Sequence, residues 1–116
     1  MRKQLTLALA VAGLGTGVAA LPSAAEPDAT ASATKRVNVG DIFFRSSRVT
    51  VQRGDAVRWV WVGRLPHNVT VTRGPVEFRS RTKRDGAYRK RLGRRGTYRY
   101  ICTLHPGMKG TVVVTG

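Results

Sequence analysis

The stretch GTYRYICTLHPGM, residues 96–108, decides the fold, because an alternating run of side chains ends there in a short loop. Tyr98, Tyr100 and Cys102 lie two residues apart, so their side chains share one face of a β-strand. Arg99 stands between them and must point toward water. The pattern predicts a strand with an apolar inner face. It also places the Cys102 thiol on the core side, where that strand ends.

From Lys35 onward the chain has short β-branched or aromatic runs separated by Gly, Asp and Pro, with no long stretch of helical periodicity. Seven or eight short strands in so small a domain favour an all-β fold, a two-sheet Greek-key β-sandwich, over a parallel sheet, which needs crossover helices. Trp59 and Trp61 share a face, and one or both are expected to pack between the sheets. The predicted strands are Arg36–Asn38, Arg48–Gln52, Ala56–Val62, Asn68–Thr72, Tyr88–Leu92, Thr97–Cys102 and Thr111–Thr115, with a further pairing around Phe78–Arg81.

Four donor side chains belong to one pattern around this strand end. His67 lies 35 residues before Cys102, and His105 and Met108 follow it. One thiolate, two imidazoles and one thioether are the donors of a blue-copper electron-transfer centre, in which the thioether takes a weak axial position. The chain has a single cysteine, which excludes both an intramolecular disulfide and a Cys-rich zinc site. The donors therefore predict one copper ion.

Each donor also has an ordinary interpretation when it is taken alone. His67 and His105 could be surface or turn histidines, Met108 could fill the core, and a single cysteine could be a stray or dimer-forming thiol. Zinc accepts one Cys and two His but has no use for a thioether. The order and spacing of all four donors, within matching strand patterns, favour copper.

Three segments resemble the cupredoxin family: VQRGDAVRW at residues 51–59, PHNV at 66–69 and GTYRYICTLHPGMKG at 96–110. The match runs from about Val37 to Val114. The plastocyanin-like proteins are the nearest group. The two-residue gap between His105 and Met108 is similar to the short ligand loop of amicyanin, whereas plastocyanins and pseudoazurins have a longer gap.

The resemblance implies a type 1 copper ion that cycles between Cu(I) and Cu(II). In this family the residue after the first histidine ligand, here Asn68, ties the two ligand loops together and tunes the sulfur by hydrogen bonding. The loop histidine, here His105, is the point of electron exit and entry, within an apolar docking patch for a transient partner. The implied copper ligands are His67, Cys102, His105 and Met108, and the implied docking residues are His105, Leu104, Pro106 and Leu65.

The amino terminus predicts export from the cytoplasm. Arg2 and Lys3 precede an uncharged, largely apolar stretch, so residues 1–25 are interpreted as a secretory signal peptide cleaved after Ala25. An uncleaved membrane anchor is the alternative, although the run is short and broken by glycine for a spanning helix. Residues 26–34 are expected to form a flexible leader, and residues 35–116 a cupredoxin-like copper-binding domain. The mature protein is then secreted or periplasmic and has no stable membrane insertion.

The charge of the chain is strongly positive, with 21 Lys and Arg against six Asp and Glu. Cleavage after Ala25 removes two basic residues and no acid, which lowers the formal charge from +15 to +13. Ten basic residues lie between Arg79 and Arg99, against Asp85 alone. Such a surface attracts anions, so a redox partner with an acidic surface is expected. A compositional bias toward arginine is an equally open origin for this charge.

Three classes of function fit these features. The first is a monomeric carrier of single electrons between redox partners. The second is a copper storage or delivery protein, although the Met-rich or His-rich tracts of such proteins are absent from the sequence. The third is a basic anion-binding module, although no nucleic-acid-binding motif accompanies the charge and no nucleic acid is expected as partner. Enzymatic activity is not expected, because both histidines serve one copper ion and none remain for further metal centres.

Overall fold

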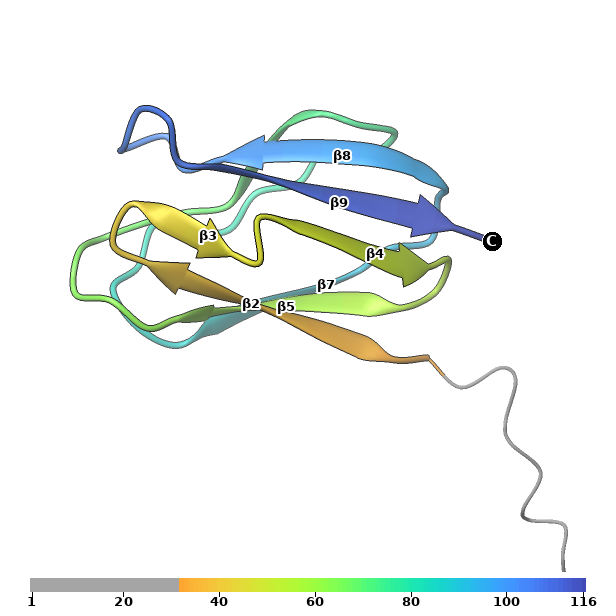
Figure 1. The fold of residues 1–116 in the computed structure, drawn as a ribbon, viewed down its shortest axis with the longest axis horizontal. Coiled ribbons are helices and arrows are strands. Elements are labelled where there is room, and N and C mark those ends of the chain that lie inside the picture. Colours follow the sequence, from red (N-terminus) through yellow and green to blue (C-terminus); the bar gives the residue numbers. More distant parts are fainter. Residues whose placement is uncertain (1–31) are drawn as a thin grey trace, which may run out of the picture. The chain divides into compact units, whose positions relative to one another are not determined.

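The structure, a computed structural model, describes residues 32–116, so the predicted signal peptide and residues 26–31 of the predicted leader lie outside the described residues. Figure 1 shows two layers of strands. No helix among residues 32–116 is long and apolar enough to cross a membrane. The strands are β2 (Thr34–Gly40), β3 (Phe43–Arg45), β4 (Arg48–Gln52), β5 (Ala56–Trp61), β6 (Thr70–Arg73), β7 (Ala87–Arg91), β8 (Gly96–Ile101) and β9 (Lys109–Thr115).

The strands form two four-stranded sheets, with the orders β3-β2-β5-β7 and β4-β9-β8-β6. The prediction of an all-β, two-sheet sandwich is therefore confirmed. Two pairs, β2 with β5 and β4 with β9, are parallel, and the other pairs are antiparallel. These parallel pairs need no crossover helix, because the chain between the paired strands passes through strands of the opposite sheet: through β4 between β2 and β5, and through β5 and β7 between β4 and β9.

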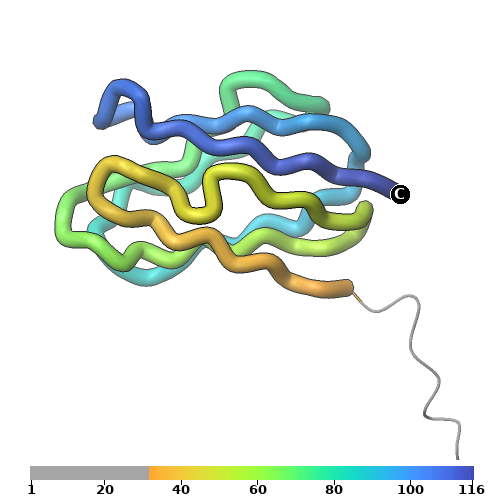
Figure 2. Tube along the Cα trace, viewed as in Figure 1, coloured from red at the N-terminus to blue at the C-terminus, as the bar shows by residue number. Residues whose placement is uncertain are grey.

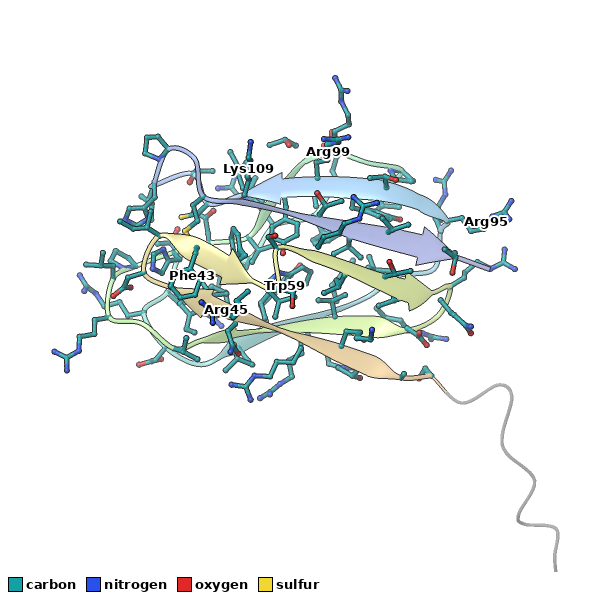
Figure 3. The ribbon with its side chains drawn as sticks, viewed as in Figure 1. Phe43, Arg45, Trp59, Arg95, Arg99 and Lys109 are labelled. Carbon is teal, nitrogen blue, oxygen red and sulfur yellow. The ribbon has the colours of Figure 1, made fainter. Side chains whose placement is uncertain are left out.

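The core follows from the period-two alternation of the strands. Trp59 of β5 and Tyr100 of β8 face each other from opposite sheets, edge to face, with ring centroids 5.4 Å apart. Phe44 adds a second edge-to-face contact with Tyr100 at 4.7 Å. Figure 3 shows Trp59 between the layers, whereas Arg99 lies on the outer side of β8. The predicted inner face of β8, formed by Tyr98, Tyr100 and Cys102, is buried throughout.

The strand boundaries differ from the predictions in places that have physical reasons. β3 was not predicted, because its three residues follow a turn with no Gly or Asn in its two-residue loop. β6 begins at Thr70 rather than Asn68, since the backbone before it pairs with residues on the segment before β7: His67 pairs with Lys83, and Ser80 donates its N–H to the Val69 oxygen. The further pairing around Phe78–Arg81 is present as an isolated bridge between Thr70 and Arg79.

Three connections gather at the end of the sandwich where β2, β5 and β8 finish (Figure 2). They are the β2–β3 turn, the loop from Val62 to Val69 and the loop from Cys102 to Met108. Hydrogen bonds hold the first two together, because Val62 donates its N–H to the Val39 oxygen at 2.9 Å and the Asp41 carboxylate accepts from the Leu65 N–H at 3.0 Å. All four predicted metal ligands lie on these connections.

Candidate metal centre

Three of the predicted ligands present their donor atoms to one another. Nδ1 of His67 lies 3.2 Å from Nδ1 of His105, and Sγ of Cys102 lies 3.8 Å and 3.5 Å from these two nitrogens. His67 and Cys102 are buried and His105 is half-buried. The chain therefore brings together residues that are up to 38 positions apart in the sequence.

The spacing of these atoms fits a metal ion. The point equidistant from the two nitrogens and the sulfur lies about 2.0 Å from each atom, close to the length of a metal–imidazole bond. Two imidazoles and a thiolate around a central point form the trigonal donor set of a blue-copper site. The same three donors could also bind zinc, so the fourth donor distinguishes the two metals.

Met108 is the fourth predicted ligand, and the fold buries its side chain while its backbone contacts the backbone of Cys102 and His105. Its side chain is 1% exposed. The loop that carries it closes on itself, because Cys102 donates its N–H to the Met108 oxygen at 3.0 Å and Met108 donates its own to the His105 oxygen at 3.1 Å. Gly107 has φ +85°, a left-handed conformation that glycine adopts without steric cost. Such a tight loop returns a thioether to the strand end that holds the thiol.

The backbone on both sides of His67 is fixed by its neighbours. His67 and Lys83 exchange two backbone hydrogen bonds of 3.0 Å, and the indole Nε1–H of Trp61 donates to the His67 oxygen at 3.2 Å. Trp61 thus supports a ligand as well as filling the core. Sequence analysis missed this contact, because a tryptophan at an inward strand position gives no sign of a polar partner.

Asn68 lies between the two ligand loops. Its Nδ2–H₂ group donates to Thr103 Oγ1 at 2.8 Å and to Thr82 Oγ1 at 3.0 Å. Its Oδ1 accepts the Thr103 N–H at 3.1 Å and the Thr70 hydroxyl at 2.9 Å. Asn68 itself is 1% exposed, whereas Thr82 and Thr103 are exposed, so only the Asn68 end of these bonds is shielded from water. The loop after His67 is thereby joined to the residue that follows Cys102.

Asp41 contacts the centre from the β2–β3 turn and was not identified from the sequence. Its Oδ1 lies 3.0 Å from Nε2 of His67 and accepts the N–H groups of Arg64 and Leu65. The hydrogen bond with His67, together with those from the two backbone groups, lowers the pKa of this carboxyl to about 2. Asp41 and His67 are 26 residues apart in the sequence, and the β2–β3 turn brings them together, so the contact is visible only in the structure.

Comparison with known proteins identifies the family. Residues 31–115 match the family model of copper-binding proteins described as plastocyanin/azurin family. The chain belongs to this cupredoxin family. It is 34% identical to amicyanin-alpha of Methylorubrum extorquens over 97% of this chain and 98% of that protein. It is also 35% identical to the amicyanin of Paracoccus versutus, over 67% of this chain and 62% of that protein.

Solved amicyanin structures share the architecture of this cupredoxin. A reduced Cu(I) form of an amicyanin variant superposes with a TM-score of 0.63 and 28% identity, covering 81% of this chain and 90% of that one. Another reduced amicyanin variant gives a TM-score of 0.64 and 29% identity, over 74% and 86% of the two chains. Family membership and the donor geometry together make the chain an amicyanin-like blue copper electron carrier rather than an enzyme. Its type 1 copper ligands are His67, Cys102, His105 and Met108.

Proposed function

We propose that this cupredoxin carries single electrons outside the cytoplasm, through His105, between redox proteins of which at least one has an acidic surface. When bound, copper supplies one-electron chemistry by alternating between Cu(I) and Cu(II). The observation that carries the proposal is the apolar rim at the copper end, formed by the five exposed large hydrophobic residues of the described chain. They are Ile42, Phe43, Val62, Leu65 and Leu104.

The position of the apolar rim supports docking next to the metal. Leu104 is 47% exposed and directly precedes His105, and Leu65 is 40% exposed and lies two residues before His67. The hydrogen bond from Leu65 to Asp41 brings the β2–β3 turn, with Ile42, to the same end. Electron-transfer contacts are small and transient, and a compact apolar patch around the ligand histidine suits such a contact. Pro106 is exposed in the same loop.

His105 is the most direct route from the site to a partner. Its Nδ1 lies 3.5 Å from the Cys102 sulfur, and His105 is only half-buried. His67, in contrast, is fully buried, and its other ring nitrogen, Nε2, is hydrogen-bonded to the Asp41 carboxylate. The loop imidazole is thus the ligand that reaches both the sulfur and the surface.

The charge distribution supports an acidic partner. The only ion pair among residues 32–116 is that of His67 with Asp41, so the arginines and lysines of this range pair with none of its own carboxylates. The basic run from Arg79 to Arg99 includes β7, which belongs to one sheet, and part of β8, which belongs to the other. Its positive charges therefore lie on both sheets. A shallow concavity of about 550 Å³ lies beside the ligand loop, and its lining includes Arg48, Arg99, Lys109 and Gly107. Figure 3 shows Arg99 and Lys109 on the outer side of β8 and β9.

The test measures how fast the reduced protein is oxidised by hexacyanoferrate(III), an anion, and by a cationic cobalt(III) complex of similar size. The rate with the anion should fall as salt is added and the Debye length shrinks to about 8 Å near physiological ionic strength. The rate with the cation should rise. The double variant Arg99→Glu, Lys109→Glu should slow the anionic reaction at low salt.

The matched control is Arg94→Glu, Arg95→Glu, which changes the net charge equally at the start of β8, away from the ligand loop. Figure 3 places Arg95 at the opposite end of that strand. The control should slow the reaction less than Arg99→Glu, Lys109→Glu. Equal rates for both double variants, or rates indifferent to salt, would remove the case for an acidic partner at the concavity.

Export is tested separately. Expression with the complete amino terminus should give a mature protein that begins at Glu26, measured as an intact mass in the periplasmic or secreted fraction. Its sedimentation should be that of a monomer. A full-length chain retained in the membrane fraction would support the anchored alternative.

A further inference from the structure

The Asp41 carboxylate holds both a ligand ring and the loop that bears it. Its Oδ1 lies 3.0 Å from Nε2 of His67, and the same oxygen accepts the N–H groups of Arg64 and Leu65, each at 3.0 Å. Oδ2 is also 3.0 Å from the Arg64 nitrogen. These bonds join the β2–β3 turn to the segment between β5 and His67.

The orientation of the His67 ring assigns its hydrogen. Nδ1 faces the Cys102 sulfur and the His105 nitrogen, so it must carry the lone pair that binds a metal. A neutral imidazole then has its hydrogen on Nε2, and a buried N–H requires an acceptor. Asp41 supplies that acceptor and carries a negative charge one imidazole ring away from the copper position.

The surrounding backbone is shaped for this contact. A Cβ on Gly63 would overlap the Asp41 carboxylate and lie 2.9 Å from the Asp41 nitrogen, so only glycine permits the close approach. Ile42, directly after Asp41, has φ +73°, a conformation that is costly for a β-branched residue. Strain of this kind persists where neighbouring contacts fix the backbone, and it commonly marks functional segments.

We propose that Asp41 is a positioning residue of the copper centre, which fixes the tautomer and orientation of His67 and stabilises Cu(II) relative to Cu(I) through its charge. The proposal rests on the copper centre described above. A carboxylate behind an imidazole ligand raises its basicity and immobilises it, and removing such a partner lowers metal affinity roughly 10- to 100-fold. A negative charge close to the ion favours its higher oxidation state and so lowers the reduction potential.

The experiment compares Asp41→Ala, Asp41→Asn and Gly63→Ala with the control Asp55→Asn. Asp55 is a matched carboxylate, because it also accepts two backbone N–H groups in a turn, from Ala33 and Gln52. It lies at the start of β5, roughly 20 Å of strand away from the end that leads to His67. Copper affinity is measured by chelator competition and the reduction potential by voltammetry. Nitrogen-15 NMR of the Cu(I) protein detects the His67 Nε2–H.

Asp41→Ala should lose the protected His67 Nε2–H signal, raise the reduction potential and weaken copper binding roughly 10- to 100-fold. Asp41→Asn should raise the potential while keeping part of the affinity, since its amide oxygen still accepts a hydrogen bond. Gly63→Ala should shift the potential in the same direction with the carboxylate still present. It therefore keeps the proposal testable should Asp41→Ala fail to fold. Asp55→Asn should retain the NMR signal and the affinity.

Two failures are distinguishable. A wild-type protein with no blue Cu(II) spectrum would overturn the copper centre and this proposal with it. A blue wild-type protein whose potential, affinity and NMR signal change no more in the Asp41 and Gly63 variants than in Asp55→Asn would overturn the role of Asp41 alone.

Discussion

The side chain of Asn68 bonds both the N–H and the hydroxyl of Thr103, at 3.1 Å and 2.8 Å, across 35 residues of sequence. Because these residues directly follow His67 and Cys102, the contact sets the distance between two ligand loops. A fixed separation between the ligands suits a site that must change oxidation state with little movement.

Asn68→Ala should lower the free energy of unfolding by about 2 kcal/mol, because it leaves the Thr103 N–H without its acceptor. It should also shift the reduction potential, since the residue after the cysteine ligand is released. Thr82→Ala is the control, because it removes only one of the Asn68 bonds and none to Thr103. Urea unfolding and voltammetry measure the two effects. An unchanged potential in Asn68→Ala would confine Asn68 to a role in stability.

Met108→Ala should keep copper but shift its reduction potential, because the axial donor is lost while the two imidazoles and the thiolate remain. Met108 is buried, so truncation also leaves a cavity. Met108→Leu fills most of that cavity without a thioether, and it should shift the potential as well. Voltammetry on both variants separates ligation from packing. Potentials equal to that of the wild type would show that Met108 is not the axial ligand.

Asp55 should make the folding stability of the protein depend on pH in the acid range. The backbone N–H groups of Ala33 and Gln52 lower the pKa of its carboxyl below the usual 3.8. A carboxyl with a lowered pKa in the folded state stabilises the protein above its unfolded pKa, and this stabilisation is lost as the pH falls through the folded value. Urea unfolding of the copper-free protein should therefore show a loss of stability below about pH 4 that is smaller in Asp55→Asn. Identical pH profiles would contradict the prediction.

Gly110→Ala should destabilise the fold by about 1–3 kcal/mol, because the added Cβ would overlap the buried Tyr100 ring. Gly93→Ala is the matched control, since a Cβ there has no neighbour within 4 Å. The difference in urea midpoint between the two variants isolates the overlap. Equal midpoints would mean that the Tyr100 ring can move aside and that β8 and β9 do not pack tightly at Gly110.

Much of the fold could be predicted from alternation alone. The inner face of β8 follows from the spacing of Tyr98, Tyr100 and Cys102, because burial on one face of a sheet imposes a period of two. The four ligands follow from their donor chemistry. The β2–β3 turn could not be predicted, because Ile42 at φ +73° occupies a position for which the favoured residue is glycine.

The residues that support the copper ligands were harder to predict from the sequence. Asp41 reaches His67 only because an unpredicted turn brings it there, and no local pattern marks a carboxylate as the partner of an imidazole. Trp61 has the spacing of a core residue, yet its indole N–H donates to the His67 oxygen. Contacts of this kind depend on how two distant segments pack, which the sequence of either segment does not specify.

The copper centre is tested most directly by the optical and electron paramagnetic resonance spectra of the protein loaded with Cu(II), before and after reduction with ascorbate. A type 1 copper site gives an intense thiolate-to-copper band at about 600 nm with a narrow copper hyperfine splitting, bleached on reduction, recovered on oxidation and absent in Cys102→Ser. A colourless protein, or an ordinary tetragonal Cu(II) spectrum that Cys102→Ser leaves unchanged, would contradict it.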